Sequence, residues 1–279
     1  MDTTVEALKK LNIALGYDGT GGVNTTVEAL KNTYVALGGD ADYVADISRI
    51  PDIIEAITSV ANKEIADDWE TIVSNIANGT TKYVVGQYKP LNLGEHGIVN
   101  MQIVAKGANA SPLADGNGNA SYDFVAKETL KTSQKLSSDS NYSGGWENSD
   151  LRQYLKESIK PLIPTTIRNA IKEVAKVSYV NTPSAGDVLT ADDLWIPSYR
   201  EIFGGESFES SGTTYKDIYK DNISRAMTAA GGTSSIDWWL RSGTKMNVPG
   251  TTAYYVTVNG TGNYGGPTTS HYVALGFSL

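Results

Sequence analysis

The sequence predicts an α+β fold, in which a helical N-terminal region precedes a domain of two helices and antiparallel strands. Two amphipathic patterns with helical spacing, over residues 146–159 and 164–177, predict the two helices. Short apolar runs bounded by Gly, Asn and Ser follow them toward the C-terminus and predict strands. Helices followed by strands with long polar loops are typical of an α+β domain.

The chain begins with an internal repeat. The segment TTVEALKKLNIALG from Thr3 recurs as TTVEALKNTYVALG from Thr25, offset by 22 residues and identical at ten of fourteen positions. In each copy a Thr suits the N-cap, a Glu three residues later completes a capping box, and a Gly ends the pattern. Each copy therefore predicts a short helix. Its apolar stripe is narrow, so we expect it to need a partner surface.

A third helix is predicted from Pro51 to about Ala77, because proline suits the first position of a helix. Within it, Ile65, Trp69, Ile72 and Ile76 follow the spacing of a coiled-coil seam over two heptads. Two interpretations stay open, a helix packed on its own domain or an oligomer-forming stalk. The predicted organisation is a helical attachment region over 1–60, a helical stalk or linker over 61–79, and a ligand-binding domain over 80–279.

Composition excludes several classes of function. The chain has no cysteine, which rules out disulfides, thiolate catalysis and cysteine-ligated zinc. Its net charge of −8 makes nucleic acid and anionic membranes poor partners. The sequence has neither a secretory signal pattern nor an apolar run of membrane-spanning length, so we expect synthesis in a bacterial cytoplasm.

Two apolar segments, 83–91 and 97–107, predict the first strands of the large domain, and a polar loop over 109–119 follows. The alternate oxygen-bearing residues of its DGNGN stretch suggest a calcium loop. An EF-hand needs a glycine at the position of Ala120 and an acid at that of Ala126, so this pattern fails. We therefore expect no metal and no cofactor.

Four motifs, in order along the chain, carry a resemblance: GGWENSDLRQYLKE, DLWIPSYREIFGG, WWLRSG and VALGFSL. Over residues 80–279 they resemble a C-type-lectin-like domain family common in bacteriophage and prophage proteins, whose members include variable proteins of diversity-generating retroelements. Separately, the stretch YVALGGDADYVADISRIPDIIEAI looks like the N-terminal region of phage head-fibre proteins and related virion-surface proteins.

The resemblance implies a C-type-lectin-like fold in which the final hairpin and its loops display the ligand surface. It also implies five structural landmarks, Trp146, Arg152, Trp238, Trp239 and Arg241. We expect Trp238 and Trp239 to pack inward and Arg241 to join a structural hydrogen-bond network. The calcium-chelating motifs of sugar-binding C-type lectins are missing, so calcium-dependent sugar binding is not implied.

The segment from Thr244 to Tyr272 has the composition of a binding surface. Of its 29 residues, 20 are Thr, Tyr, Asn, Ser or Gly, and one, Lys245, is charged. Antibody paratopes have the same bias, because Tyr offers contact area and the small polar residues adapt their hydrogen bonds. The alternative is that these are strand and turn residues, with a hairpin turn at Asn259-Gly260. The predicted ligand-binding residues are Thr244, Asn247, Tyr254, Asn259, Thr261, Asn263, Tyr264, Thr268, Thr269, Ser270 and His271.

Catalysis is not expected. No Asp or Glu occurs between Trp238 and Leu279, so this segment alone cannot supply the carboxylate pair of a glycosidase. The two histidines are His96 and His271, and no acid lies near His271 in the sequence to orient it. We predict no catalytic residues.

Together these observations predict a phage virion-surface protein of the head-fibre or receptor-binding type, made in the bacterial cytoplasm. Its expected partners are a host-cell surface protein or glycan, phage capsid or tail proteins, and further copies of itself in a homotrimer. The residue types at the display positions are also those that adenine-directed retroelement variation yields. Two alternatives stay open, a fixed capsid decoration protein and a glycan-processing enzyme.

Overall fold

A computed structural model describes residues 26–36, 64–80, 82–140, 142–180, 186–204, 209–245 and 250–279. The chain divides into two compact units, Met1–Tyr88 and Lys89–Leu279. The first copy of the repeat and most of the head-fibre-like stretch lie outside the described residues.

In the first unit, helix α2 (Thr26–Ala36) lies where the second copy of the repeat predicts a helix. Helix α5 (Trp69–Ala77) is shorter than the helix predicted to start at Pro51, and the prediction is wrong over residues 64–68. Asp68 caps α5 by accepting a hydrogen bond of 2.8 Å from the backbone of Thr71. Before this cap the chain is extended, and Ile65 N donates to Tyr88 O at 2.8 Å. Because Ile65 precedes the helix, the four apolar residues do not form one helical seam.

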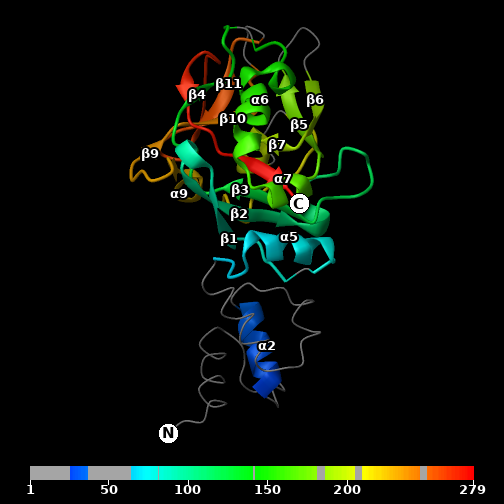
Figure 1. The fold of residues 1–279 in the computed structure, drawn as a ribbon. Helices are drawn as coiled ribbons and strands as arrows, with labels where there is room; N and C mark the ends of the chain where they lie inside the picture. Colours follow the sequence, from blue (N-terminus) through cyan, green and yellow to red (C-terminus); the bar gives the residue numbers. More distant parts are fainter. Residues whose placement is uncertain are drawn as a thin grey trace. The chain divides into compact units, whose positions relative to one another are not determined.

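A five-stranded sheet organises the second unit, in the order β1-β2-β3-β14-β7. Its strands are β1 (Tyr88–Asn92), β2 (Ile98–Lys106), β3 (Tyr122–Ala126), β7 (Leu194–Trp195) and β14 (Gly276–Ser278). The pairs β2-β3, β3-β14 and β14-β7 are antiparallel. The C-terminal strand thus fills an interior position, as Figure 1 shows. There Phe277 stacks on Phe124 with ring centroids 5.4 Å apart.

The first predicted helix of this unit is confirmed, with a varied geometry. It runs through η3 (Trp146–Asn148), α6 (Asp150–Tyr154), the π-helical η4 (Leu155–Ile159) and η5 (Lys160–Leu162). Ser149 is the N-cap and accepts a hydrogen bond from Arg152 N at 3.1 Å. The predicted apolar face, formed by Leu151, Leu155 and Ile159, is buried.

The second predicted helix is correct only in its first half. Helix α7 ends early (Thr165–Ala170), and Val174 begins strand β5 (Val174–Val180), which pairs with β6 (Gly186–Asp192). Val174, Lys176 and Ser178 are buried while Ala175 and Val177 are less so, which is the two-residue period of a strand. This alternation and the β-branched content overcame the helical spacing that the sequence also carries.

In the motif DLWIPSYREIFGG, strand β7 is followed by helix α8 (Tyr199–Phe203), at which Ser198 and Glu201 form a capping box. Short elements near them are η1 (Gly94–His96), η2 (Gly107–Asn109), β4 (Gln134–Lys135), α9 (Asn222–Arg225), β8 (Met227–Thr228) and β9 (Ser235–Ile236).

The C-terminal region forms a second, three-stranded antiparallel sheet in the order β10-β11-β12. Its strands are β10 (Trp238–Gly243), β11 (Ala253–Val256) and β12 (Gly262–Gly265), and β13 (Ser270–His271) pairs with β4. The hairpin turn predicted at Asn259-Gly260 is confirmed, since Gly260 N donates to Thr257 O at 2.8 Å. Within the C-terminal motif VALGFSL, only Gly276–Ser278 is a strand.

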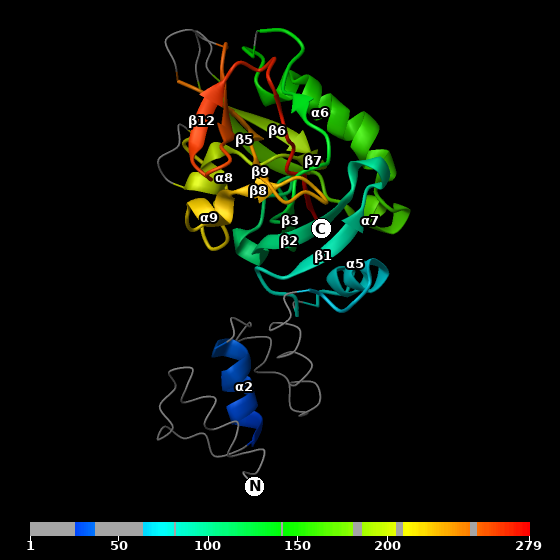
Figure 2. The same cartoon turned by 90° about the vertical axis from the view of Figure 1, so that its left-hand side faces the viewer.

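Figure 2 shows β12 at the outer side of this sheet, with α8 and α9 near one end of it. The second unit thus combines helices with antiparallel sheets, and the predicted α+β class is confirmed at this level.

Candidate functional site

Two of the five landmark residues meet at one buried carboxylate. Trp146 Nε1 donates to Asp192 Oδ2 at 3.1 Å, and Arg152 Nε donates to Asp192 Oδ1 at 2.6 Å. Asp192 ends β6, so this contact joins the helix at 146–154 to the β5-β6 hairpin. Both landmarks are therefore structural contacts inside the second unit.

The tandem tryptophans of β10 are both buried, as expected. Trp238 Nε1 donates to Arg225 O at 3.1 Å, and Trp239 Nε1 donates to Gln134 O at 2.9 Å. Two indoles neighbouring in sequence thus reach α9 on one side and β4 on the other. They hold the three-stranded sheet in place from both of its faces.

Arg241 belongs to a buried charge cluster with Glu201 and Lys176. Arg241 Nη1 lies 2.6 Å from Glu201 Oε2, and Lys176 Nζ lies 3.0 Å from Glu201 Oε1. Burial by itself would raise the pKa of Glu201, but the two cations hold it at about 2. The capping box of α8 fixes the carboxylate, because Ser198 N donates to Glu201 Oε2 at 2.8 Å. A paired and hydrogen-bonded arrangement of this kind is what a buried carboxylate requires.

The predicted ligand-binding residues lie mainly on β11, β12, β13 and their turns. Alternation along the strands divides them between two faces of the sheet. On one face Tyr254 is the register partner of Tyr264. The Tyr254 ring packs on that of Tyr199 of α8, with ring centroids 4.4 Å apart. On the other face Tyr255 is the partner of Asn263, whose Nδ2 donates to the Tyr255 hydroxyl at 2.9 Å. The sequence predicted a single surface and did not resolve this division.

An aromatic ladder supports the second face. The Tyr255 and His271 rings stack with centroids 4.2 Å apart, and His271 meets Trp239 edge-on at 4.5 Å. Because Trp239 is completely buried, the ladder connects an exposed surface to the core. The display residues are therefore mounted on a rigid base.

The remaining predicted residues differ in exposure. Asn259, Thr261, Thr269 and Ser270 are exposed, Thr268 is half-buried, and Tyr264 is 44% exposed. The prediction that Thr244 binds a ligand at the surface is wrong, because its side chain is buried. Thr244 is 1% exposed, and its hydroxyl is hydrogen-bonded to that of Thr252 beside the end of β10. Asn247 lies outside the described residues.

Tertiary structure provides His271 with the acid that its sequence neighbours lack. Asp237 Oδ2 lies 4.0 Å from His271 Nδ1, and Asp237 Oδ1 accepts a hydrogen bond of 2.8 Å from Val258 N. Burial lowers the pKa of His271, and the Asp237 charge opposes this only in part. We infer that His271 is neutral near pH 7 and acts chiefly as a ring in the ladder.

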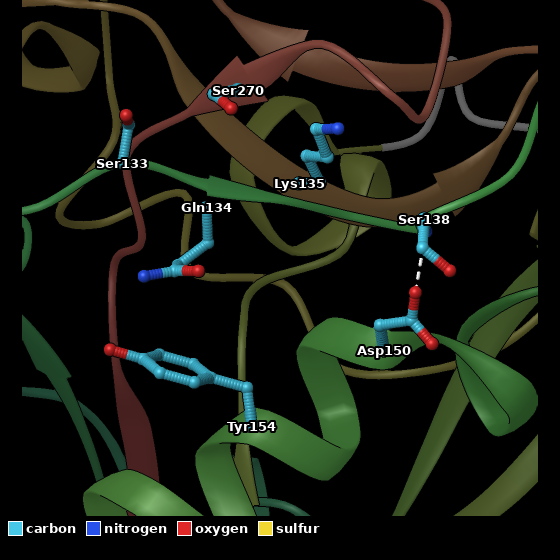
Figure 3. A pocket seen from close by; sticks show the side chains of 7 residues that line it. All are labelled: Ser133, Gln134, Lys135, Ser138, Asp150, Tyr154 and Ser270. Carbon is cyan, nitrogen blue, oxygen red and sulfur yellow. Dashed lines mark hydrogen bonds between the residues drawn. The ribbon is translucent and has the colours of Figure 1, made fainter.

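A hollow of about 330 Å³ lies beside β13, between β4 and α6 (Figure 3). Its lining is polar: Ser133, Gln134, Lys135, Ser138, Asp150, Tyr154 and Ser270. In Figure 3 the side chains of Gln134 and Tyr154 point into the same space, and Asp150 bonds to the backbone of Ser138. The Tyr154 hydroxyl is buried beside the side chains of Thr132 and Gln134. Burial raises the pKa of Tyr154.

Sequence reasoning missed several residues of this region. Tyr255 adjoins the predicted Tyr254 and could have been included from the same apolar run. Asp237, Gln134 and Tyr154 carry no local signal, because they reach β13 from distant parts of the chain. Within the described ranges no group of three or more His, Asp or Glu side chains could hold a metal ion. The helices in these ranges also include none with the length and apolar character of a membrane span.

Residues 121–273, more than half of the chain, match a family described as a domain of unknown function, DUF6273. The chain belongs to this family. Searches of curated proteins and of solved structures returned no match. The family match begins just before β3 and ends just after β13, so it includes the buried charge cluster, the ladder and the hollow.

Proposed function

We propose that this DUF6273 member is a phage virion-surface protein that binds a host-surface or mucosal ligand through β11, β12 and β13 of a C-type-lectin-like domain. The observation that carries the proposal is the ladder Trp239, His271 and Tyr255, which mounts a charge-poor surface on the core. Binding groups on a rigid base lose little entropy when a ligand docks.

The exposed groups on this surface suit a polar, uncharged ligand. Asn263, on the same face as Tyr255, and Asn259, in the adjoining turn, offer amide donors and acceptors. Tyr264 lies on the opposite face of the edge strand β12 and offers a ring that is 44% exposed. The neighbouring hollow adds one ammonium group, from Lys135, and one carboxylate, from Asp150, so its formal charges balance. Aromatic faces beside balanced polar groups favour a glycan over a charged ligand.

The virion setting is supported by the resemblance of the N-terminal stretch to head-fibre proteins. A homotrimer attached to capsid or tail proteins would present several copies of the surface, so weak binding at each copy would be multiplied. Diversification by a retroelement is part of the same proposal. Alignment of the gene with a nearby template repeat tests it, and differences that do not fall at template adenines would contradict it.

The binding proposal is tested by adhesion of the full chain to bacterial cells and to a glycan array. The double variant Asn263→Ala/Tyr264→Ala should lose adhesion at least tenfold and keep its thermal stability. Leu162→Ala is the matched control, since it removes another exposed apolar side chain, 40% exposed, at the end of η5. This control should bind as the unaltered chain does.

Two outcomes would replace the proposal. Unchanged adhesion of the double variant would place the binding surface elsewhere, and no adhesion by the unaltered chain would favour a fixed decoration protein. Release of cleaved sugar from a bound glycan would instead indicate an enzyme. Its candidate carboxylates would be Asp237, 4.0 Å from His271, and Asp150, which lines the hollow with Ser270.

A further inference from the structure

A second cavity, of about 320 Å³, lies on the β5-β6 side of the second unit. Val177 and Leu189 of the β5-β6 hairpin line it, as do Ser211 and Thr213 of the loop after α8. The buried charge cluster forms its inner end, because Glu201 and Arg241 also line it. It shares no lining residue with the hollow beside β13.

The guanidinium of Arg241 has a donor left for a ligand. Its Nε donates to Val177 O at 3.1 Å, and its Nη1 donates to Ile196 O and to Glu201, each at 2.6 Å. Within the described structure no hydrogen bond uses Nη2. Arg241 is 2% exposed, so water has little access to this nitrogen except through the cavity that the side chain lines. Because Nη2 is not fully enclosed by protein atoms, it can reach the cavity, where a ligand oxygen can accept a charge-assisted hydrogen bond from it.

The charges around this donor select against an anion. Glu201 is ionised next to the cavity, and its two oxygens already accept hydrogen bonds from Lys176, Thr213, Ser198 and Arg241. Three buried carboxyl groups, those of Glu201, Asp123 and Glu209, already face the cations Lys176 and Arg241. A ligand carboxylate would add an unbalanced negative charge to this buried group. A neutral carbonyl oxygen would not.

The mouth of the cavity is apolar. Pro112, Ala175, Val177 and Leu189 line it, and Leu189 is 65% exposed although it is a large aliphatic residue. An apolar mouth above a buried donor has the form of a small-molecule pocket, in which a few polar groups orient a mostly apolar ligand.

We propose that this cavity binds a small neutral molecule whose carbonyl or amide oxygen accepts a hydrogen bond from Arg241 Nη2 and whose aliphatic part contacts Val177 and Leu189. The site is separate from the β11-β13 surface. The family would then have a small-molecule site in addition to its proposed surface for a host ligand.

The experiment titrates the full chain, labelled with ¹⁵N, with isovaleramide and with isovalerate, which match in shape but differ in charge. We expect saturable shifts in the Arg241 side-chain Nε–H and the Val177 and Thr213 amides, with a dissociation constant in the millimolar range for so small an amide. Isovalerate should bind at least tenfold more weakly.

The matched variants are Ser211→Trp, which fills the cavity from an exposed loop, and Ser234→Trp, which places the same ring at another exposed position. Ser211→Trp should abolish the shifts with an otherwise unchanged spectrum, while Ser234→Trp and Tyr264→Ala should leave them unaltered. The proposal is overturned if isovaleramide causes no saturable shift, if the shifts persist in folded Ser211→Trp, or if isovalerate binds equally well.

Discussion

The buried charge cluster and the β11-β13 surface lie in one unit but use polar groups in opposite ways. In the cluster every oxygen of Glu201 is taken by an internal donor, and Arg241 and Lys176 are each 2% exposed or less. On the surface, Asn259 and Tyr264 are exposed, and within the described part of the chain their side chains form no hydrogen bond to the core. The ladder through Tyr255 and His271 links the surface to the core.

This difference separates stability from binding. A substitution in the cluster leaves a buried charge without its partner, which is among the largest destabilising effects known for single residues. A substitution at an exposed position outside special contacts changes stability by less than about 0.5 kcal/mol. We therefore expect unfolding experiments to report on the cluster and adhesion experiments to report on the surface.

The largest effect is expected for Glu201→Ala. It would strand two buried cations and lower the free energy of unfolding by about 3–5 kcal/mol. Urea denaturation of the full chain measures this. Glu95→Ala, at a side chain that is 86% exposed, is the control and should change stability by less than about 0.5 kcal/mol. Equal effects of the two variants would mean that the cluster does not stabilise the fold.

The same carboxylate predicts an acid dependence of stability. The pKa of Glu201 is about 2 in the folded chain against a usual 4.5, so the folded state holds this proton less tightly than the unfolded state does. Its contribution is therefore present above pH 4.5 and is lost as the pH falls toward about 2. Denaturation midpoints across this window should fall more steeply for the unaltered chain than for Glu201→Gln. Parallel curves would assign the acid sensitivity to other carboxyls.

A glycine that joins the hairpin to α9 predicts the next effect. Gly260 has φ +74°, and a Cβ added there would lie 1.7 Å from Asn222 O. Gly260→Ala should therefore lower the free energy of unfolding by about 1–3 kcal/mol. Gly266→Ala is the matched control in the same segment, since its Cβ would meet only Thr268 Oγ1, at 4.0 Å. Thermal unfolding of both variants tests this, and similar losses would mean that the turn geometry is not the cause.

His271 in the ladder should also make the stability of the fold depend on pH, but less strongly than Glu201 does. Burial lowers the pKa of His271, so the unfolded chain takes up a proton at this position before the folded chain does. Stability should decrease as the pH falls below about 6.5, the ordinary value for histidine. His271→Phe keeps a ring on Tyr255 and should remove this part of the pH dependence. An unchanged slope between pH 7 and pH 5 in that variant would contradict the assignment.

The smallest effect on stability is expected for Tyr264, on the edge strand β12. Tyr264→Ala should change the free energy of unfolding by less than about 0.5 kcal/mol, because its ring projects from an edge strand. Adhesion is expected to fall in the same variant. A stability loss as large as that of Gly260→Ala would show that Tyr264 supports the packing of Tyr254 and α8, and would weaken its assignment to ligand contact.

The sequence was most informative where one local pattern had no competitor. Ser149 and the face of Leu151, Leu155 and Ile159 specified the helix at 146–159, and Asn259-Gly260 specified a hairpin turn. The sequence was misleading where the spacing of a helix and the alternation of a strand overlapped. In residues 171–177 a helical spacing of apolar residues coexists with the alternation of β5, and pairing with β6 decided for the strand.

Local sequence determined the α+β class, most helix starts and the charge-poor composition of the C-terminal segment, because caps, turns and periodicity act over a few residues. Tertiary structure alone decided which groups meet. It brought Asp237 to His271, Gln134 and Tyr154 to Ser270, and Glu201 between Lys176 and Arg241. It also buried Thr244, and it packed Tyr254 against Tyr199 of α8 and Tyr255 against His271. These outcomes depend on strand register and on contacts between distant segments, which no local pattern encodes.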